Sequence, residues 1–217
     1  MAVAPNILTA GPYTAANASA IFANQNTGAA GNFNINGTLA TNGVATLDLP
    51  RRVLITTVGN EANSIFTLYG TNSDGISICE AITGPNASNA TSVRDYKTVT
   101  RLAINATPSG NVRAGTTTVA STPWFPMNRY WTPFNVGVSV VVSGTVNYTV
   151  EYTDANLFDL SVVQTTTSIP VFSHPVLASQ TANASDNFAF PVGAVRLTLN
   201  SWSGSGTASM YLRQQRN

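Results

Sequence analysis

The stretch FNVGVSVVVSGTVNYTVEYT, from Phe134 to Thr153, decides the fold class of this chain. Apolar residues alternate along it with small or polar ones, and successive side chains of a β-strand point to opposite faces of a sheet. Small polar residues in the middle of the stretch are typical of a turn. We therefore predict a β-hairpin with one apolar face. That face consists of Val136, Val138, Val140 and Val142.

Two further stretches follow the same pattern: LPRRVLITTVGNEANSIFTLYGT from Leu49 to Thr71, and FPVGAVRLTLNSWSGSGTASMYLRQ from Phe190 to Gln214. Each predicts another hairpin, the first with strands at 53–58 and 65–69. The chain has no heptads and no sustained period of 3.6 residues. The sequence therefore predicts an all-β fold, an antiparallel β-sandwich of the jelly-roll kind.

A composition change near each end of these blocks suggests the domain organisation. Residues 1–45 are rich in Ala, Asn, Gly and Thr, and predict an extended N-terminal arm with one hairpin at Asn36-Gly37. The arm either lies across a neighbouring subunit or packs locally. Residues 46–122 form a first β unit, 123–133 a corner rich in proline and aromatic residues, and 134–217 a second β unit. The two units can also be one continuous sandwich.

Glu80 interrupts an apolar face of the predicted strand at 76–83. Its side chain shares that face with Ile76, Ile78 and Ile82. Glu80 is therefore expected either to have a buried polar partner or to be displaced by a β-bulge.

The chain is unusually poor in charge. Only 9% of its 217 residues are charged, against roughly 25% in an average soluble protein, and Lys97 is the sole lysine. Charge depletion marks the buried centre of protein–protein interfaces, so we predict self-association; a neutral, Thr-rich exposed sheet is the alternative. The net charge of +1 without a basic run argues against nucleic acid. No apolar stretch approaches the roughly 20 residues of a membrane-spanning helix.

The residues that perform chemistry are scarce. His174 is the only histidine, and no nucleophile motif accompanies it. Cys79 lies within an alternating strand, as a buried apolar residue would, and a single cysteine excludes an intrachain disulfide. With no signal-peptide pattern at the N-terminus, we expect synthesis in a reducing cytoplasm. We predict no catalytic residues, no cofactor and no metal; two carboxylates brought together from distant strands remain the route to an enzyme.

The block RRVLITTVGNEANSIFTLYGTNSDGISICEAITGPN, followed by YKTVTRLAIN, resembles a pattern in virion structural proteins of tailed double-stranded DNA bacteriophages. VSGTVNYTVEYT and FPVGAVRLTLNSWSGSGTASMYLRQ resemble later parts of such proteins. The resemblance covers most of residues 50–214. It implies a non-enzymatic β-sandwich subunit in a symmetric assembly. No functional residues carry over, because the shared pattern describes hairpins.

These observations together predict a capsid decoration, or cement, subunit that is made in the bacterial host cytoplasm and located in the virion. It would bind copies of itself, as a trimer, and the major capsid protein or other virion proteins. One alternative is a tail, collar or fibre-anchoring protein. Another is a carbohydrate-binding module or adhesin, with Trp202 or the corner aromatics stacked on sugars. The expected partner-binding residues are Pro5, Ile7, Tyr13, Phe22, Phe33, Trp124, Tyr130 and Trp131.

Overall fold

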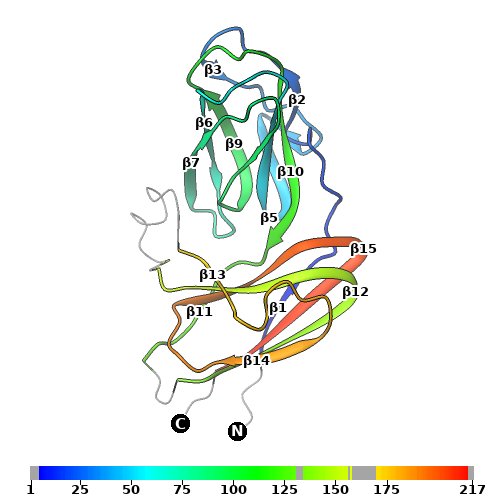
Figure 1. Cartoon of the computed structure of the whole chain (residues 1–217), viewed down its shortest axis with the longest axis vertical. Coiled ribbons are helices and arrows are strands. Elements are labelled where there is room, and N and C mark those ends of the chain that lie inside the picture. The colour runs from blue at the N-terminus through cyan, green and yellow to red at the C-terminus, as the bar shows by residue number, and fades with distance from the viewer. Residues whose placement is uncertain (1–4, 131–133, 156, 158–169, 215–217) are drawn as a thin grey trace. The chain divides into compact units, whose positions relative to one another are not determined.

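The computed structural model describes residues 5–130, 134–155, 157 and 170–214. These residues form β-strands joined by turns and loops, with no helix among them, and the strand pairs are antiparallel (Figure 1). The predicted all-β class is confirmed. The chain divides into two compact units. Among the described residues, the first unit contains 5–13, 118–130, 134–155, 157 and 170–214, and the second contains 14–117.

The first unit is organised by two very long strands. These are β12 (Val136–Thr153) and β15 (Ala194–Gln214), which pair from Val136↔Gln214 to Thr153↔Ala194. Both strands bend near their middles, so that their halves lie in two layers (Figure 1). Other strands extend the sheet on either side: β1 (Asn6–Ala10), the end of β10 (Val112–Ser121) and β11 (Phe125–Pro126) beside β15, and β13 (Phe172–Ser173) and β14 (Ala184–Phe188) beside β12.

Two of the predicted hairpins are wrong, because each of these stretches is a single continuous strand. The Ser-Gly segment of β12 lies at a break in register between Ser143 and Thr145, where Gly144 has a φ of 72°. Gly204 of β15 has a φ of 58°. Glycines of this kind serve equally well in a turn or in a bulge. Here each strand satisfies its backbone hydrogen bonds with the other strand instead of folding back on itself.

The apolar face of this stretch is buried at three of its four valines. Val136, Val138 and Val140 are almost completely buried, and Val142 is half-buried. Beyond the bulge, Val146 and Tyr148 are buried as well. The valine face of β12 therefore belongs to the core of the first unit.

The second unit contains β2 (Phe22–Gln25), β3 (Gly31–Asn32), β4 (Ala40–Thr41), β5 (Val44–Thr57), β6 (Ile65–Thr71), β7 (Ser77–Thr83), β8 (Asn89–Thr91), β9 (Tyr96–Ile104) and most of β10. Its main strand order is β10-β5-β9-β6-β7 (Figure 1). The predicted hairpin between β5 and β6 is wrong, since β9 lies between them. The link is a crossover held by Glu61, whose carboxylate accepts hydrogen bonds from the Ser109 amide at 2.6 Å and the Ser109 hydroxyl at 2.7 Å.

The N-terminal segment differs from the expected extended arm. β1 pairs with β15 over its full length, and residues 14–45 belong to the second unit. Phe22 and Phe33 are buried and stack at a centroid distance of 5.0 Å. The hairpin of this segment turns at Asn42-Gly43, where both φ angles are positive, and not at Asn36-Gly37. Apolar burial thus makes this segment part of both units.

The domain bounds of the structure also differ from the expected ones. The corner at 123–133 lies inside the first unit, where Phe125 and Pro126 pair with β15. Residues 131–133 of this corner lie outside the described residues. The β unit predicted at residues 46–122 corresponds to the second unit of the structure. This unit begins at residue 14 and ends within β10, because the apolar residues before residue 46 complete its core.

Candidate interaction surface

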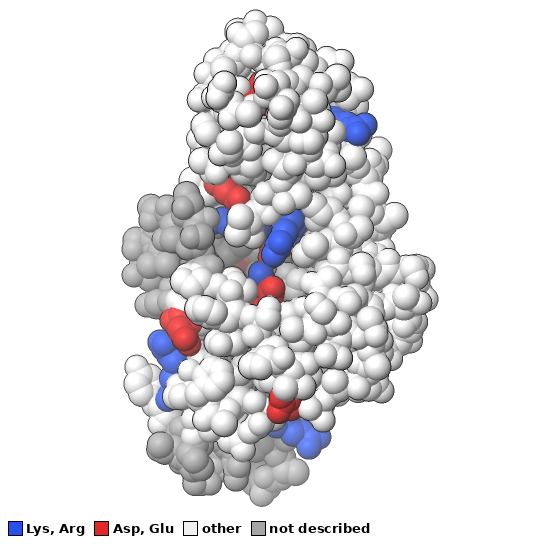
Figure 2. Space-filling model, in the orientation of Figure 1, with Lys and Arg blue, Asp and Glu red and all other residues white. Residues whose placement is uncertain are grey.

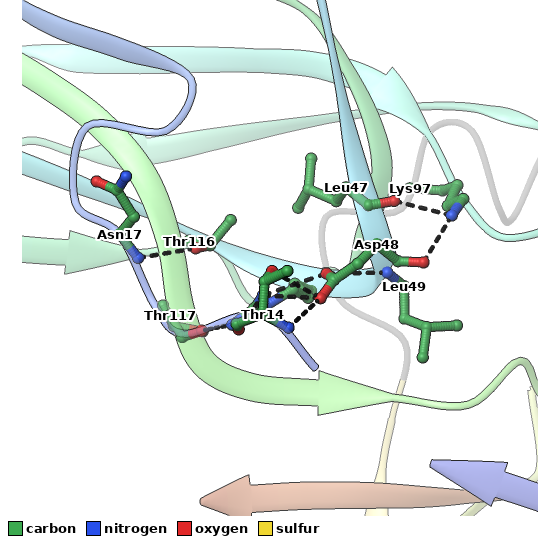
Figure 3. Close-up of polar contacts among 9 residues, drawn as sticks. Thr14, Asn17, Leu47, Asp48, Leu49, Lys97, Thr116 and Thr117 are labelled. Atoms are coloured by element: carbon green, nitrogen blue, oxygen red, sulfur yellow. Dashed lines mark hydrogen bonds and ion pairs between the residues drawn. The ribbon is translucent and has the colours of Figure 1, made fainter. Parts of the chain in front are cut away.

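Arg51 is a charged residue in the interior of the second unit. Its side chain is fully buried, and its guanidinium donates to the Thr14 carbonyl at 3.0 Å, the Thr117 carbonyl at 2.7 Å and Asp48 at 3.2 Å (Figure 3). Asp48 also accepts hydrogen bonds from the Thr14 amide and hydroxyl, both at 2.9 Å. Burial alone would raise the pKa of Asp48, but these hydrogen bonds and the Arg51 charge outweigh it and hold the pKa below its usual value.

The only lysine of the chain, Lys97, binds backbone beside Asp48. The Lys97 ammonium donates to the Leu47 carbonyl at 2.8 Å and to the Asp48 carbonyl at 2.9 Å (Figure 3). A lysine side chain normally extends into water and adds charge to a surface. Here its ammonium instead satisfies the backbone beside β5.

Glu80 has the buried partners that the sequence allowed for. Its carboxylate accepts hydrogen bonds from the amides of Val93 at 2.7 Å and Arg94 at 3.1 Å. The register of β7 with β6 is regular at Glu80, so no bulge is involved. Burial raises the pKa of Glu80, and the two amide hydrogen bonds offset this only in part. The carboxylate thus holds the 92–95 loop onto the sheet.

The first unit buries an ion pair of its own. Arg196 Nε lies 2.7 Å from Glu151 Oε2, and the Thr198 hydroxyl donates to the same oxygen at 2.8 Å. The Arg196 guanidinium also lies 4.5 Å from the centre of the Trp124 ring. Trp124 is half-buried and its ring face is occupied by this cation.

These internal contacts leave an almost neutral exterior. On the face drawn in Figure 2, uncharged residues dominate and the charged ones are few and scattered. Within the described part of the chain, the charged side chains in exposed positions are Asp74, Arg101, Arg129, Asp154 and Arg213. One of them, Arg101, stacks on the Tyr69 ring at 3.7 Å. The charge depletion seen in the composition is therefore stronger still at the surface.

An exposed aromatic cluster lies on the first unit, at the edge of its sheet. The Tyr152 ring on β12 contacts the Phe172 ring on β13 at 5.4 Å and the Phe190 ring at 5.6 Å. Phe172 is 48% exposed and Phe190 43% exposed, although both are large apolar residues. Val171 and Val176, on the same segment as Phe172, are exposed as well. We call the rings of Tyr152, Phe172 and Phe190 the Phe172 patch.

His174 packs against a residue that contacts this cluster, Phe188. Its ring is buried and packs on Phe188 at 4.7 Å, edge to face. Nδ1 accepts hydrogen bonds from the amides of Val176 at 3.2 Å and Leu177 at 3.3 Å, and Nε2 lies 3.4 Å from the Asn187 carbonyl. Both ring nitrogens therefore hold backbone, as in a structural histidine.

The ionisable neighbour of the His174 ring is Asp186, whose Oδ2 lies 4.0 Å from Nδ1. Cys79 is half-buried on β7, in the second unit. Among the residues that the structure describes, no three His, Cys, Asp or Glu side chains are arranged to hold a metal ion. The same residues include no helix with the length and apolar character to cross a bilayer.

A hollow of about 350 Å³ lies beside Tyr130, which is 91% exposed. Met127, Leu157 and Ala194 contribute apolar walls, and Arg129 is the charged residue in its lining. The described lining residues offer a cation and a phenol, and none of them is a carboxylate or histidine that could complete a pair for acid–base chemistry.

The residues that the sequence proposed for partner binding are spread over very different environments. Tyr13, Phe22 and Phe33 are buried, and Tyr13 packs on Trp202 at 4.8 Å. Pro5 and Trp124 are half-buried, while Ile7 and Tyr130 are exposed. Trp131 lies outside the described residues. The N-terminal aromatics thus serve the core, and with three of the seven described residues buried these seven do not form one contact surface.

Sequence reasoning missed the Phe172 patch. Its two phenylalanines lie in PVFSHP and FAFP, which are too short and too interrupted by proline to show a period of two. The usable signal was the proline pattern itself, because proline confines a segment to the edge of a sheet or a loop. Apolar residues at an edge are candidates for contact.

Comparison with known proteins does not identify this chain: no protein-family model matches it, and no curated protein matches its sequence.

Proposed function

We propose that this protein is a structural subunit of a virion, and within the virion a capsid decoration subunit that stabilises the shell through protein–protein contacts. The observation that carries the proposal is the inward placement of charge. Arg51, Arg196, Glu61 and Glu80 are buried, and Lys97 is bound to backbone carbonyls. What remains outside is an extensive neutral surface.

Such a surface suits permanent contact with other proteins. A charge covered by a partner loses its hydration, and this costs several kcal/mol per ion unless the pairing is excellent. Neutral Asn, Thr and Ser side chains cost much less to cover. A neutral contact is also nearly independent of ionic strength, because there is little charge to screen. Both properties suit a subunit that remains on a particle in varying surroundings.

The resemblance to phage virion proteins supports the location, since it spans most of residues 50–214. The described tryptophans weigh against the carbohydrate-binding alternative, in which a ring face must be open to a sugar. Trp124 is half-buried under Arg196, and Trp202 is half-buried against Tyr13. These contacts favour a surface that meets protein.

Copy number tests the proposal. Particles are purified from the phage whose genome encodes this chain, and its copies per particle are measured by quantitative mass spectrometry with isotope-labelled peptides. Decoration predicts a copy number that matches the local symmetry axes of the icosahedral shell, and density on the outside of the head in electron micrographs. Only a few copies, at the tail, would support the tail or collar alternative instead. Absence from the particle would refute the proposal.

Salt dependence provides the second measurement. Purified protein is added to particles of a phage whose genome lacks the gene for this chain. The fraction of protein bound to the particles is then measured at increasing NaCl concentrations. Going from about 0.1 M to 1 M salt shortens the screening length from roughly 10 Å to roughly 3 Å. A contact between neutral surfaces predicts an unchanged bound fraction. Release by salt would show that the few exposed charges carry the binding.

A further inference from the structure

We infer that the Phe172 patch is the surface through which copies of this chain bind one another. This deepens the proposed function, on which it rests, by naming the surface and the partner. The patch consists of Tyr152, Phe172 and Phe190, defined above by their ring contacts.

The rings of the patch pack on one another and on a buried aromatic side chain. Tyr152 also contacts Phe188 at 5.4 Å, and Phe188, which is fully buried, contacts Phe190 at 5.9 Å. His174 packs on the other side of Phe188 and fixes the following loop through its two amide hydrogen bonds. Aromatic side chains that are already ordered lose little entropy on binding, and aromatic residues dominate interface hot spots.

The sheet edge beside the patch is closed to strand addition. β13 is the last strand in the order β13-β12-β15, so its outer side has no strand partner among the described strands. Pro170 and Pro175 flank it and have no amide hydrogen to donate. The Pro170 carbonyl already accepts the Thr153 hydroxyl at 2.6 Å. A partner must therefore contact the side chains, and it cannot extend the sheet.

The charge distribution identifies a second copy as the partner. Residues 170–185 contain no Asp, Glu, Lys or Arg, and neither do residues 187–195. A partner that covered this area with charged groups would leave them desolvated and unpaired. Contact about a two-fold axis avoids this, because each apolar patch then meets an identical one. The sparse exposed charges of the chain make a second copy complementary around the patch as well.

The test uses the full chain in solution. Its mass is measured by light scattering and mass photometry across a range of concentrations, for the wild type and for Phe172→Arg and Phe190→Arg separately. The wild type is expected to be oligomeric. Each variant is expected to raise the dissociation constant at least 30-fold, which corresponds to a hot spot of about 2 kcal/mol. The control is Val58→Arg, which places the same charge on an exposed valine of the second unit and should leave the mass unchanged.

Circular dichroism establishes whether each variant is folded. Phe172→Ser, which introduces no charge, replaces any variant that does not fold. Amide hydrogen exchange of the wild type gives an independent readout. Residues 170–176 should be better protected at high protein concentration than at low concentration, whereas the segment around Val58 should not change. A monomeric wild type at 100 µM would overturn the inference. So would folded Phe172 and Phe190 variants that remain oligomeric.

Failure of this inference is distinguishable from failure of the proposed function. If the chain self-associates through the patch but is absent from particles, the inference holds and the virion proposal fails. If the wild type is monomeric in solution yet decorates particles, and Phe172→Arg abolishes that decoration, the partner is another virion protein. The virion proposal then holds, and the inference is overturned.

Discussion

Replacing Arg51 by methionine tests whether buried charge, and not apolar packing alone, holds residues 14–17 in the second unit. The Arg51 side chain is fully buried and donates to the carbonyls of Thr14 and Thr117 and to the carboxylate of Asp48. Methionine has a similar length and apolar character but no donors. Two backbone carbonyls and one carboxylate therefore lose a partner, while the volume of the site changes little.

The structure sets the size of the effect. Removing one member of a buried ion pair costs about 3–5 kcal/mol. The Asp48 side chain is 23% exposed and keeps its two hydrogen bonds from Thr14, so water can partly replace the guanidinium. The Thr117 carbonyl loses the donor at 2.7 Å, a loss of about 1–3 kcal/mol for a buried acceptor. We therefore expect Arg51→Met to lower the free energy of unfolding by about 3 kcal/mol.

The assay is urea unfolding of the full chain, followed by circular dichroism and by tryptophan fluorescence. Trp124 and Trp202 both lie in the first unit, so a loss confined to the second unit should shift the dichroism transition more than the fluorescence transition. Arg101→Met is the matched control, because Arg101 is an exposed arginine of the second unit. Its loss should cost less than about 1 kcal/mol.

A double-mutant cycle with Asp48→Asn completes the experiment. Each single variant leaves a partner behind, whereas the double variant removes both charges together. The loss for the double variant should therefore fall short of the sum of the single losses by about 2 kcal/mol. An Arg51→Met protein within 0.5 kcal/mol of the wild type, or losses that simply add, would refute the reasoning.

Three further predictions follow from individual residues. Burial raises the pKa of Glu80 above its usual value of 4.5, so the folded state takes up a proton more readily than the unfolded state. The stability of the wild type relative to Glu80→Gln should therefore rise as the pH is lowered from 7 towards 4.5. A difference in urea midpoints that stays constant with pH would contradict this. Gly144→Ala should lower the free energy of unfolding by about 1 kcal/mol because of its φ of 72°, while Gly137→Ala in the same strand should change it by less than about 0.5 kcal/mol; equal losses for the two variants would argue against a strained bend. The Lys97 amine should react slowly with acylating reagents in the native protein and rapidly in urea, as followed by peptide mass spectrometry, and fast native labelling would mean that its two carbonyl contacts are open in solution.

The candidate surface was only partly predictable. The 9% charged composition and the single lysine indicated a neutral exterior without any coordinates. Composition does not tell which of the few charges are buried, however, and the depletion is greatest at the surface because Arg51 and Arg196 lie inside. Nor could it locate the Phe172 patch, which brings together side chains from β12, β13 and the segment after β14 that are up to 38 positions apart (Tyr152 to Phe190).

Local alternation determined that this chain is made of strands and which side chains of each strand are buried. That information is contained in a few neighbouring residues, because the pleat of an extended backbone imposes a period of two whatever the strand pairs with. Val136, Val138, Val140 and Val142 were placed on one face on this ground alone, and the first three of them are buried.

Only the tertiary structure decided which strands are neighbours. A Ser-Gly segment closes a hairpin if the two flanking stretches pair with each other, and forms a bulge if a distant strand offers a longer ladder, as β15 does for β12. In the same way, β9 separates β5 from β6, and the N-terminal aromatics fill a core instead of reaching outward. The choice depends on the apolar area and hydrogen bonds gained over the whole chain, and no local stretch of sequence contains that sum.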